Sequence, residues 1–127
     1  MSDIQPGKTS NPSKVLVVED VVLIRMTIVD MVEDLGHAAV EAGDGPQALE
    51  ILRQDPSIAI LLTDLGLPGM PGRELVVKAR ELRPDLKVVV ASGYPSELAA
   101  ADAAFKGVRY LAKPFDLERL RVAISEA

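Results

Sequence analysis

The fold is decided by residues 58–72, which read Ile-Ala-Ile-Leu-Leu-Thr-Asp-Leu-Gly-Leu-Pro-Gly-Met-Pro-Gly. The apolar run 58–63 predicts a buried strand, and a Gly/Pro-rich loop begins directly behind one carboxylate, Asp64. This carboxylate is therefore expected at the C-terminal end of a strand. In open parallel α/β sheets, ligands bind outside those ends.

Two other segments share this layout. The apolar run 15–18 leads into Glu19 and Asp20, and residues 108–112 lead into Lys113 and Pro114. Three acids and one lysine, each at the end of a strand, suggest a site for a metal ion and a phosphate group. Three crowded carboxylates repel one another, so they favour a divalent cation that prefers oxygen ligands. Mg²⁺ is the expected ion, with Mn²⁺ as an alternative.

Strand-like and helix-like segments alternate along the rest of the chain. Strands are predicted at about 14–18, 37–42, 58–63, 86–91 and 108–112. The first helix is predicted from its apolar positions Ile24, Ile28, Met31, Val32 and Leu35. Asp44-Gly45-Pro46 opens a second helix, and others are predicted at about 73–82, 96–105 and 117–125, the last burying Leu117, Leu120 and Ile124. The alternation implies right-handed βα units in one doubly wound, five-stranded parallel sheet of the α/β class.

Size and composition fit one domain at 14–127, preceded by a polar, turn-rich tail at 1–13 that is expected to be disordered. The chain has 127 residues, 48% of them hydrophobic, and a net charge of −5. The negative charge argues against binding to nucleic acid or an anionic membrane. The absence of cysteine, of a signal peptide and of an apolar span leads us to expect a cytoplasmic protein.

Four motifs in this order resemble those of two-component response regulator receiver domains, over about residues 14–126. They are Val-Val-Glu-Asp at 17–20, Asp-Leu-Gly-Leu-Pro-Gly-Met-Pro-Gly at 64–72, Ala-Ser-Gly-Tyr at 91–94 and Tyr-Leu-Ala-Lys-Pro-Phe at 110–115. The resemblance implies a flavodoxin-like fold with strand order 2-1-3-4-5. Val21 and Val22 depart from the family, which often has a polar or acidic residue and then proline there.

The resemblance also assigns roles, residue by residue. It implies that Asp64 is the phosphoacceptor and that Mg²⁺ is held by Asp20, Asp64, Glu19 through water, and the backbone carbonyl of Gly66. Further roles follow for the motifs at 91–94 and 110–115: Ser92 is the switch hydroxyl, Gly93 leaves space for the phosphoryl group, Lys113 contacts phosphate and Tyr110 is the switch aromatic.

The same resemblance sets the expected partners. The phosphoryl group would come from a histidine kinase or a histidine phosphotransfer protein, and an unknown protein target would receive the signal. Phosphorylation would change the surface formed by the helix 96–105, the strand 108–112 and the helix 117–125, which is also the expected dimer face. No turnover of an external substrate is expected beyond Mg²⁺-dependent self-phosphorylation and autodephosphorylation.

Three other interpretations remain open. The chain could be the C-terminal receiver module of a hybrid histidine kinase, or an interaction module that is never phosphorylated. A nucleotide- or flavin-binding enzyme of similar fold would need a Gly-rich loop after the first strand, where this chain has Glu-Asp-Val-Val-Leu-Ile. The one histidine, His37, follows Gly36 at a turn and is expected at the surface. A phosphodonor histidine would be expected on an exposed helix face, so the donor is expected to be another protein.

Overall fold

Five apolar segments form one parallel sheet in the computed structural model, which describes residues 12–93 and 105–127. The strands are β1 (Lys14–Val18), β2 (Ala38–Ala42), β3 (Ile60–Asp64), β4 (Lys87–Ser92) and β5 (Arg109–Ala112). Their order across the sheet is β2-β1-β3-β4-β5, as the resemblance implied. All four pairings are parallel, so the C-terminal ends of the strands lie along one edge.

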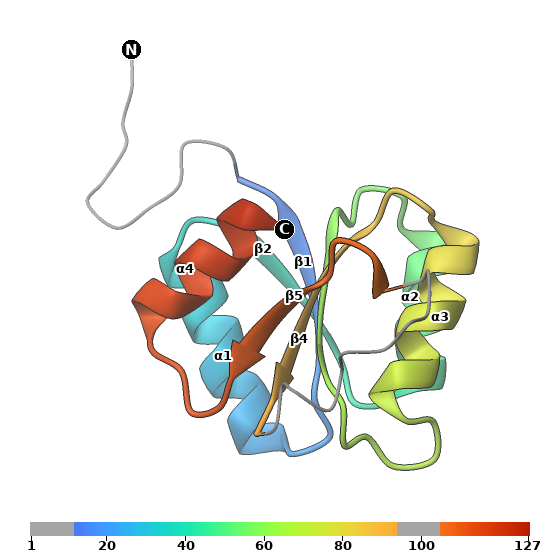
Figure 1. The fold of residues 1–127 in the computed structure, drawn as a ribbon, viewed down its shortest axis with the longest axis horizontal. Coiled ribbons are helices and arrows are strands. Elements are labelled where there is room, and N and C mark those ends of the chain that lie inside the picture. Colours follow the sequence, from blue (N-terminus) through green and yellow to red (C-terminus); the bar gives the residue numbers. More distant parts are fainter. Residues whose placement is uncertain (1–11, 94–104) are drawn as a thin grey trace.

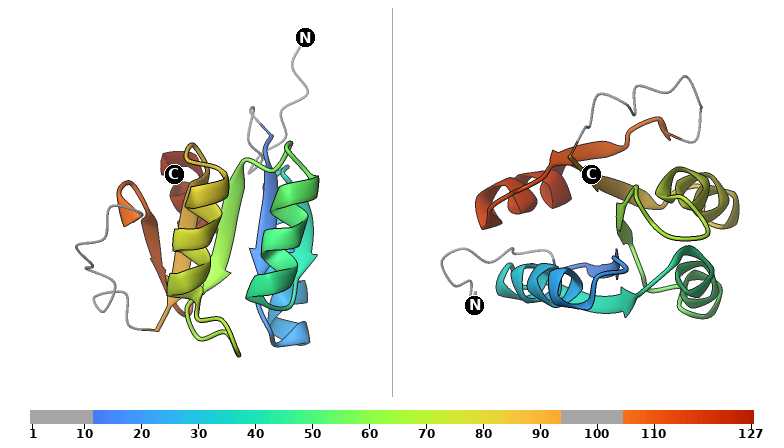
Figure 2. Two further views of the ribbon diagram at one scale, coloured as in Figure 1. Left: turned by 90° about the vertical axis from the view of Figure 1, so that its right-hand side faces the viewer. Right: turned by 90° about the horizontal axis from the view of Figure 1, so that it is seen from below.

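Helices cover both faces of this sheet (Figures 1 and 2). They are α1 (Val22–Asp34), α2 (Gly45–Gln54), α3 (Gly72–Leu82) and α4 (Leu117–Glu126). One buried cluster joins the sheet to α2 and α3, and a second joins it to α1 and α4. The helix predicted at 96–105 lies outside the described residues except for Phe105, which is buried.

Strand side chains alternate between these two clusters, as the two-residue period of a strand requires. On β1, Leu16 and Val18 face α2 and α3, whereas Val15 and Val17 face α1 and α4. Burial on both faces explains why β1 is a continuous apolar run. Within the described residues, no helix has the length and apolar character needed to cross a bilayer.

Two helices begin at side-chain caps that the sequence contains. Asp44 accepts a hydrogen bond from the backbone N–H of Gln47 at 2.8 Å, and Asp116 accepts one from Arg119 at 2.8 Å. Helix α1 has no such cap, because Val21 precedes it.

Two predicted burial states are wrong. Leu117, expected to be buried, is 37% exposed, and Ile24, which the helical spacing placed on the apolar face of the first helix, is itself 43% exposed. Both lie in the first turn of their helix, whereas Ile28, Val32, Leu120 and Ile124 in later turns are buried. His37, expected at the surface, is 8% exposed, and its Nδ1 accepts a hydrogen bond from the backbone N–H of Ser13 at 2.9 Å.

Candidate functional site

Four neighbouring strands bring the predicted site residues to one edge of the sheet. Asp64 is the last residue of β3, and Ser92 is the last residue of β4. Glu19 directly follows β1, and Lys113 directly follows β5. The parallel register aligns these ends: Val18 pairs with Thr63, Asp64 with Ala91, and Ser92 with Ala112.

Lys113 lies between two of the acids. Its Nζ is 3.1 Å from Asp64 Oδ2 and 3.4 Å from Glu19 Oε1. The backbone N–H of Lys113 also donates to the Ser92 carbonyl at 2.9 Å, which fixes the start of the loop after β5. The next peptide bond, Lys113–Pro114, is cis. The charged end of Lys113 therefore reaches the carboxylates from β5, an edge strand of the sheet.

Glu19 is the buried member of the acid group, with 2% of its surface exposed. Its Oε2 accepts a hydrogen bond from the backbone N–H of Val21 at 3.1 Å. Burial raises the pKa of this carboxyl, and nearby Asp20 and Asp64 raise it further, while the Val21 bond and Lys113 oppose the shift. Burial therefore makes the charged form of Glu19 less favourable than it is in water, and a bound cation would offset this cost.

The three acids fit a divalent ion. Glu19, Asp20 and Asp64 each offer a carboxylate oxygen, and these oxygens lie within 4.8 Å of one another. An all-oxygen set of carboxylates is the kind of donor set that Mg²⁺ takes, usually with several waters retained. Asp20 is exposed and Asp64 is partly exposed, so the group is open to solvent on one side.

The loop after β3 stays close to Asp64. Gly66 is exposed, and its backbone N–H lies 3.4 Å from Asp64 Oδ1. Gly72, at the start of α3, donates its N–H to the Leu65 carbonyl at 2.9 Å. A Cβ on Gly72 would lie 2.1 Å from the carbonyl oxygen of Asp64. The sequence pattern did not identify this close approach, although Gly after Pro71 was a visible signal.

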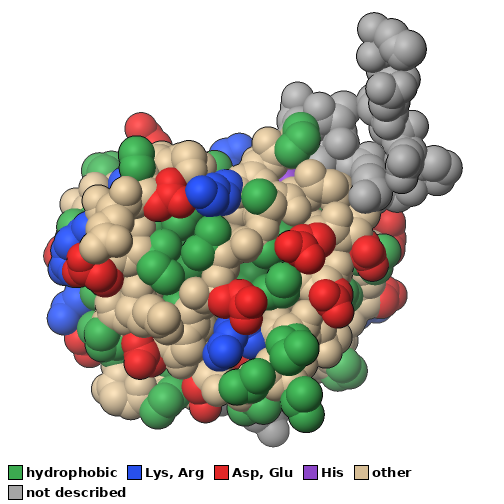
Figure 3. Space-filling model, turned by 180° about the vertical axis from the view of Figure 1, so that it is seen from behind, with side chains coloured by type: hydrophobic (Ala, Val, Ile, Leu, Met, Phe, Trp, Pro, Cys, Tyr) green, Lys and Arg blue, Asp and Glu red, His purple; other side chains and the backbone are tan. Residues whose placement is uncertain are grey.

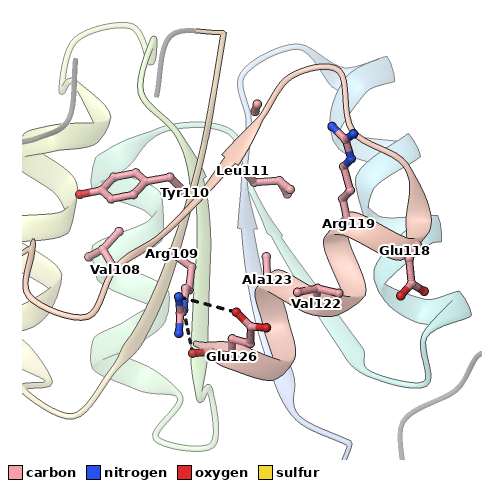
Figure 4. A pocket seen from close by; sticks show the side chains of 10 residues that line it. Val108, Arg109, Tyr110, Leu111, Glu118, Arg119, Val122, Ala123 and Glu126 are labelled. Atoms are coloured by element: carbon pink, nitrogen blue, oxygen red, sulfur yellow. Dashed lines mark hydrogen bonds and ion pairs between the residues drawn. The ribbon is translucent and has the colours of Figure 1, made fainter. Parts of the chain in front are cut away.

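The predicted switch residues lie on the two strands that follow β3 across the sheet, with Ser92 at the end of β4 and Tyr110 within β5. Ser92 is buried at the end of β4, and Gly93 follows it with open space where a Cβ would be. Tyr110 is 39% exposed, and its ring lies on the side of β5 away from α4 (Figure 4). Leu111, the next residue, points toward α4 and is buried.

A groove of ≈ 550 Å³ lies along β5 and α4. At one end of it, Arg109 Nε donates to the Glu126 carbonyl at 2.9 Å, and Arg109 Nη1 is 3.6 Å from Glu126 Oε1 (Figure 4). Two of the three elements of the expected output surface therefore border one concave face. The third, predicted at 96–105, lies outside the described residues apart from Phe105.

Sequence reasoning also missed Arg25. Its Nη1 donates to the carbonyl oxygen of Glu19 at 2.8 Å, and its Nε donates to Glu41 Oε1 at 3.0 Å. A basic residue in an otherwise apolar opening of α1 was the available signal. Its partner on β2 could not be identified without the strand pairing.

Comparisons with known proteins agree with this arrangement. Residues 15–125 match the family described as the response regulator receiver domain. The chain is 33% identical to the response regulator receiver protein CpdR of Brucella abortus (strain 2308), with 84% of this chain and 89% of that protein covered. It is 34% identical to the sensor kinase CckA of the same organism, covering 92% of this chain but 13% of the kinase.

A solved structure shares the fold as well. A sensor protein from Polaromonas sp. JS666 superposes with a TM-score of 0.82 at 27% identity, covering 92% of this chain and 96% of that one. The family match spans both clusters of the core and all four strand ends that carry the acids, the serine and the lysine. The chain belongs to the response regulator receiver domain family of two-component signalling systems.

Proposed function

We propose that residues 14–127 form a receiver domain that accepts a phosphoryl group on Asp64. The observation that carries this proposal is the Lys113 amine 3.1 Å from an Asp64 carboxylate that shares one sheet edge with two further acids. Asp64 is the acid at the centre of this edge, and its side chain is 20% exposed, so a donor can reach it.

The reaction is a displacement at phosphorus. A carboxylate oxygen of Asp64 forms the new P–O bond, while the bond from phosphorus to the donor's imidazole nitrogen or acetyl oxygen breaks and the leaving group keeps that electron pair. A divalent ion, when bound, would supply positive charge to the transferred oxygens. Lys113 would supply a second positive charge. The ion would be held by Glu19, Asp20, Asp64 and the Gly66 carbonyl. The phosphorylated product would be bordered by Ser92 and Gly93.

Incubation with Mg²⁺ and acetyl phosphate tests the assignment. Intact mass is expected to show one added phosphoryl group on the wild type and none on Asp64→Asn. Asp85→Asn is the matched control, because Asp85 is an exposed acid just before β4, at the opposite end of the sheet. Labelling of Asp64→Asn at the wild-type level would refute the role of Asp64.

The phosphodonor is inferred to be a histidine kinase or a histidine phosphotransfer protein. The histidine of this chain is unsuited to that role, because His37 is buried and its Nδ1 already accepts the Ser13 N–H. A second support is an apolar patch formed by the exposed residues Val21, Val22, Leu23, Ile24 and Met26. Hydrophobic side chains gather at the lower edge of one face in Figure 3.

This patch directly follows Asp20 in the chain, so a protein that covers it reaches the acid group. An exposed apolar cluster next to polar residues is typical of a protein interaction site. We infer that signalling proceeds through protein contact, with no turnover of an external substrate.

The output step is inferred from the places of Ser92 and Tyr110. The acyl phosphate adds negative charge beside Asp64, which draws the Ser92 hydroxyl inward, and the Tyr110 ring follows into the space that is vacated. The groove between β5 and α4 would change as a result, for a downstream protein or a second copy of the chain. Hydrogen exchange of β5 and α4 amides that is unaltered by acetyl phosphate and Mg²⁺ would contradict this step.

A second candidate is a receiver module within a hybrid histidine kinase. It is favoured by the similarity to CckA, a sensor kinase of which this chain covers 13%. The similarity to CpdR over 89% of that protein favours a separate receiver. The length of the natural reading frame distinguishes the two.

A further inference from the structure

The carbonyl oxygen of Glu19, one residue before Asp20, is held by a side chain from α1. Arg25 Nη1 donates to it at 2.8 Å, and Arg25 Nε donates to Glu41 Oε1 on β2 at 3.0 Å. The Arg25 side chain is 17% exposed. Because a guanidinium is planar, these two bonds fix its orientation, and Arg25 ties the end of β1 to β2.

The other polar groups of Glu19 have partners as well. Its backbone N–H donates to the Ala42 carbonyl at 3.1 Å. Its two carboxylate oxygens lie 3.1 Å from the Val21 N–H and 3.4 Å from Lys113 Nζ. With Arg25 on the carbonyl, every polar atom of Glu19 is held, so the peptide leading into Asp20 has one preferred direction.

The neighbouring loop leaves room for this arrangement. A Cβ on Gly43 would lie 3.3 Å from Arg25 Nη1, which is closer than an ordinary contact. The Gly43 N–H donates to Gln47 Oε1 at 2.7 Å, so the loop is itself anchored to α2. Gly43 does not have a positive φ, so its backbone conformation does not require glycine. Glycine is needed here because a side chain would crowd Arg25.

We propose that Arg25 is a positioning residue for the divalent ion, with Glu41 orienting it and Gly43 leaving it space. This inference rests on the proposed function, in which Glu19, Asp20 and Asp64 hold that ion. By fixing the Glu19 carbonyl, Arg25 orders the peptide before Asp20, the most exposed of the three acids. A ligand that is ordered beforehand loses less freedom when the ion binds, and such outer contacts support metal affinity.

The positive charge of Arg25 allows a positioning role to be distinguished from a purely electrostatic one. A positive charge near three carboxylates weakens cation binding by simple repulsion, so removing it should tighten Mg²⁺ binding if charge were its only effect. A positioning role predicts the opposite sign. Arg25→Lys separates the two further, because an ammonium keeps the charge but lacks the rigid fork that serves both acceptors.

The experiment is a calorimetric titration with Mg²⁺, without any phosphodonor. Arg25→Gln is expected to raise the Kd for Mg²⁺ about 10-fold, which is the lower end of the usual loss of affinity when a residue that hydrogen-bonds to a metal ligand is replaced. Arg25→Lys should weaken it to a smaller extent, and so should Glu41→Gln. Glu41→Gln should add nothing in the Arg25→Gln background, because Glu41 acts through Arg25. Arg53→Gln is the matched control, since Arg53 forms an exposed ion pair with Glu50 on α2.

Gly43→Ala provides a second test of the role of Arg25 if Arg25→Gln fails to fold. It retains the arginine, crowds the guanidinium and should also weaken Mg²⁺ binding. Unchanged or tighter Mg²⁺ binding in folded Arg25→Gln, or in Gly43→Ala and Glu41→Gln together, would overturn the role of Arg25. A wild type that binds no Mg²⁺ would overturn the metal site of the proposed function, and this inference with it. Normal wild-type binding with unaffected variants would leave the proposed function intact.

Discussion

Lys113 Nζ lies 3.1 Å from Asp64 Oδ2, so the lysine partly neutralises the acid group when no metal ion is bound. Lys113→Met keeps the apolar stem and removes the charge. We expect its melting temperature in EDTA to fall, at a cost of about 1–2 kcal/mol, because partly buried carboxylates lose their partner. Excess Mg²⁺ should raise the melting temperature more in this variant than in the wild type. Equal Mg²⁺ responses would contradict a shared electrostatic role.

Glu19 supplies the opposite case, because its charged form is disfavoured in the fold. Burial raises the pKa of Glu19, so its ionisation opposes folding as the pH rises above 4.5, the ordinary value for this group. Glu19→Gln retains an oxygen for the Val21 N–H and removes the charge. In EDTA at pH 7 we expect a higher melting temperature than the wild type, together with a smaller Mg²⁺-induced increase. A lower melting temperature in EDTA would show that the Lys113 contact outweighs the burial cost.

The edge on which the acid group lies was predictable from chain direction, because Asp64, Glu19 and Lys113 each end an apolar run and parallel strands end at the same edge. That these ends also lie close together depends on the strand order, in which β1, β3, β4 and β5 follow one another across the sheet. The helical spacing identified α1, but it does not show which of the apolar positions along the helix are covered by the sheet. Ile24 therefore fitted the helical spacing and still lies in solvent. Arg25 and His37 depend on partners far away in the chain, Glu41 and Ser13, which only the fold supplies.

Gly72 gives a stability prediction for the loop that carries Asp64. A Cβ there would lie 2.1 Å from the Asp64 carbonyl oxygen and 2.7 Å from Leu65 Cα, both backbone atoms that cannot rotate away. Gly72→Ala is expected to cost about 1–3 kcal/mol in the free energy of unfolding and to weaken Mg²⁺ binding by shifting Asp64. Gly66→Ala is the control for stability alone, because a Cβ there meets nothing within 4 Å. Denaturant unfolding that gives equal stabilities for the two variants would contradict this role of Gly72.

His37 makes stability depend on pH. Burial lowers the pKa of His37 below its ordinary 6.5, so the unfolded chain takes up the proton first as the pH falls. The free energy of unfolding should therefore decrease below pH 6.5, down to the pKa of the folded state. His37→Asn retains an acceptor for the Ser13 N–H and removes the titration. Melting curves in EDTA at pH 7.5 and 5.5 are expected to show a smaller decrease for the variant. A parallel decrease in both proteins would assign the pH dependence to other groups.

The apolar patch Val21, Val22, Leu23, Ile24 and Met26 leads to a prediction about the phosphodonor. Leu23 is 75% exposed, so Leu23→Ser should change the free energy of unfolding by no more than about 0.5 kcal/mol. Labelling by acetyl phosphate should stay at the wild-type rate, because that donor needs no protein contact. Transfer from a phosphorylated histidine protein should slow, because the complex with the donor no longer gains the free energy of burying the Leu23 side chain.

Leu82→Ser is the matched control for this last test. Leu82 is 41% exposed at the end of α3, away from the strand ends that carry the acids. Its replacement should leave both reactions unchanged. If Leu23→Ser slows neither reaction, the donor contacts another surface; if it slows both equally, the substitution has disturbed the acid group itself. Only a selective loss of protein-dependent transfer supports the patch as the contact for the donor.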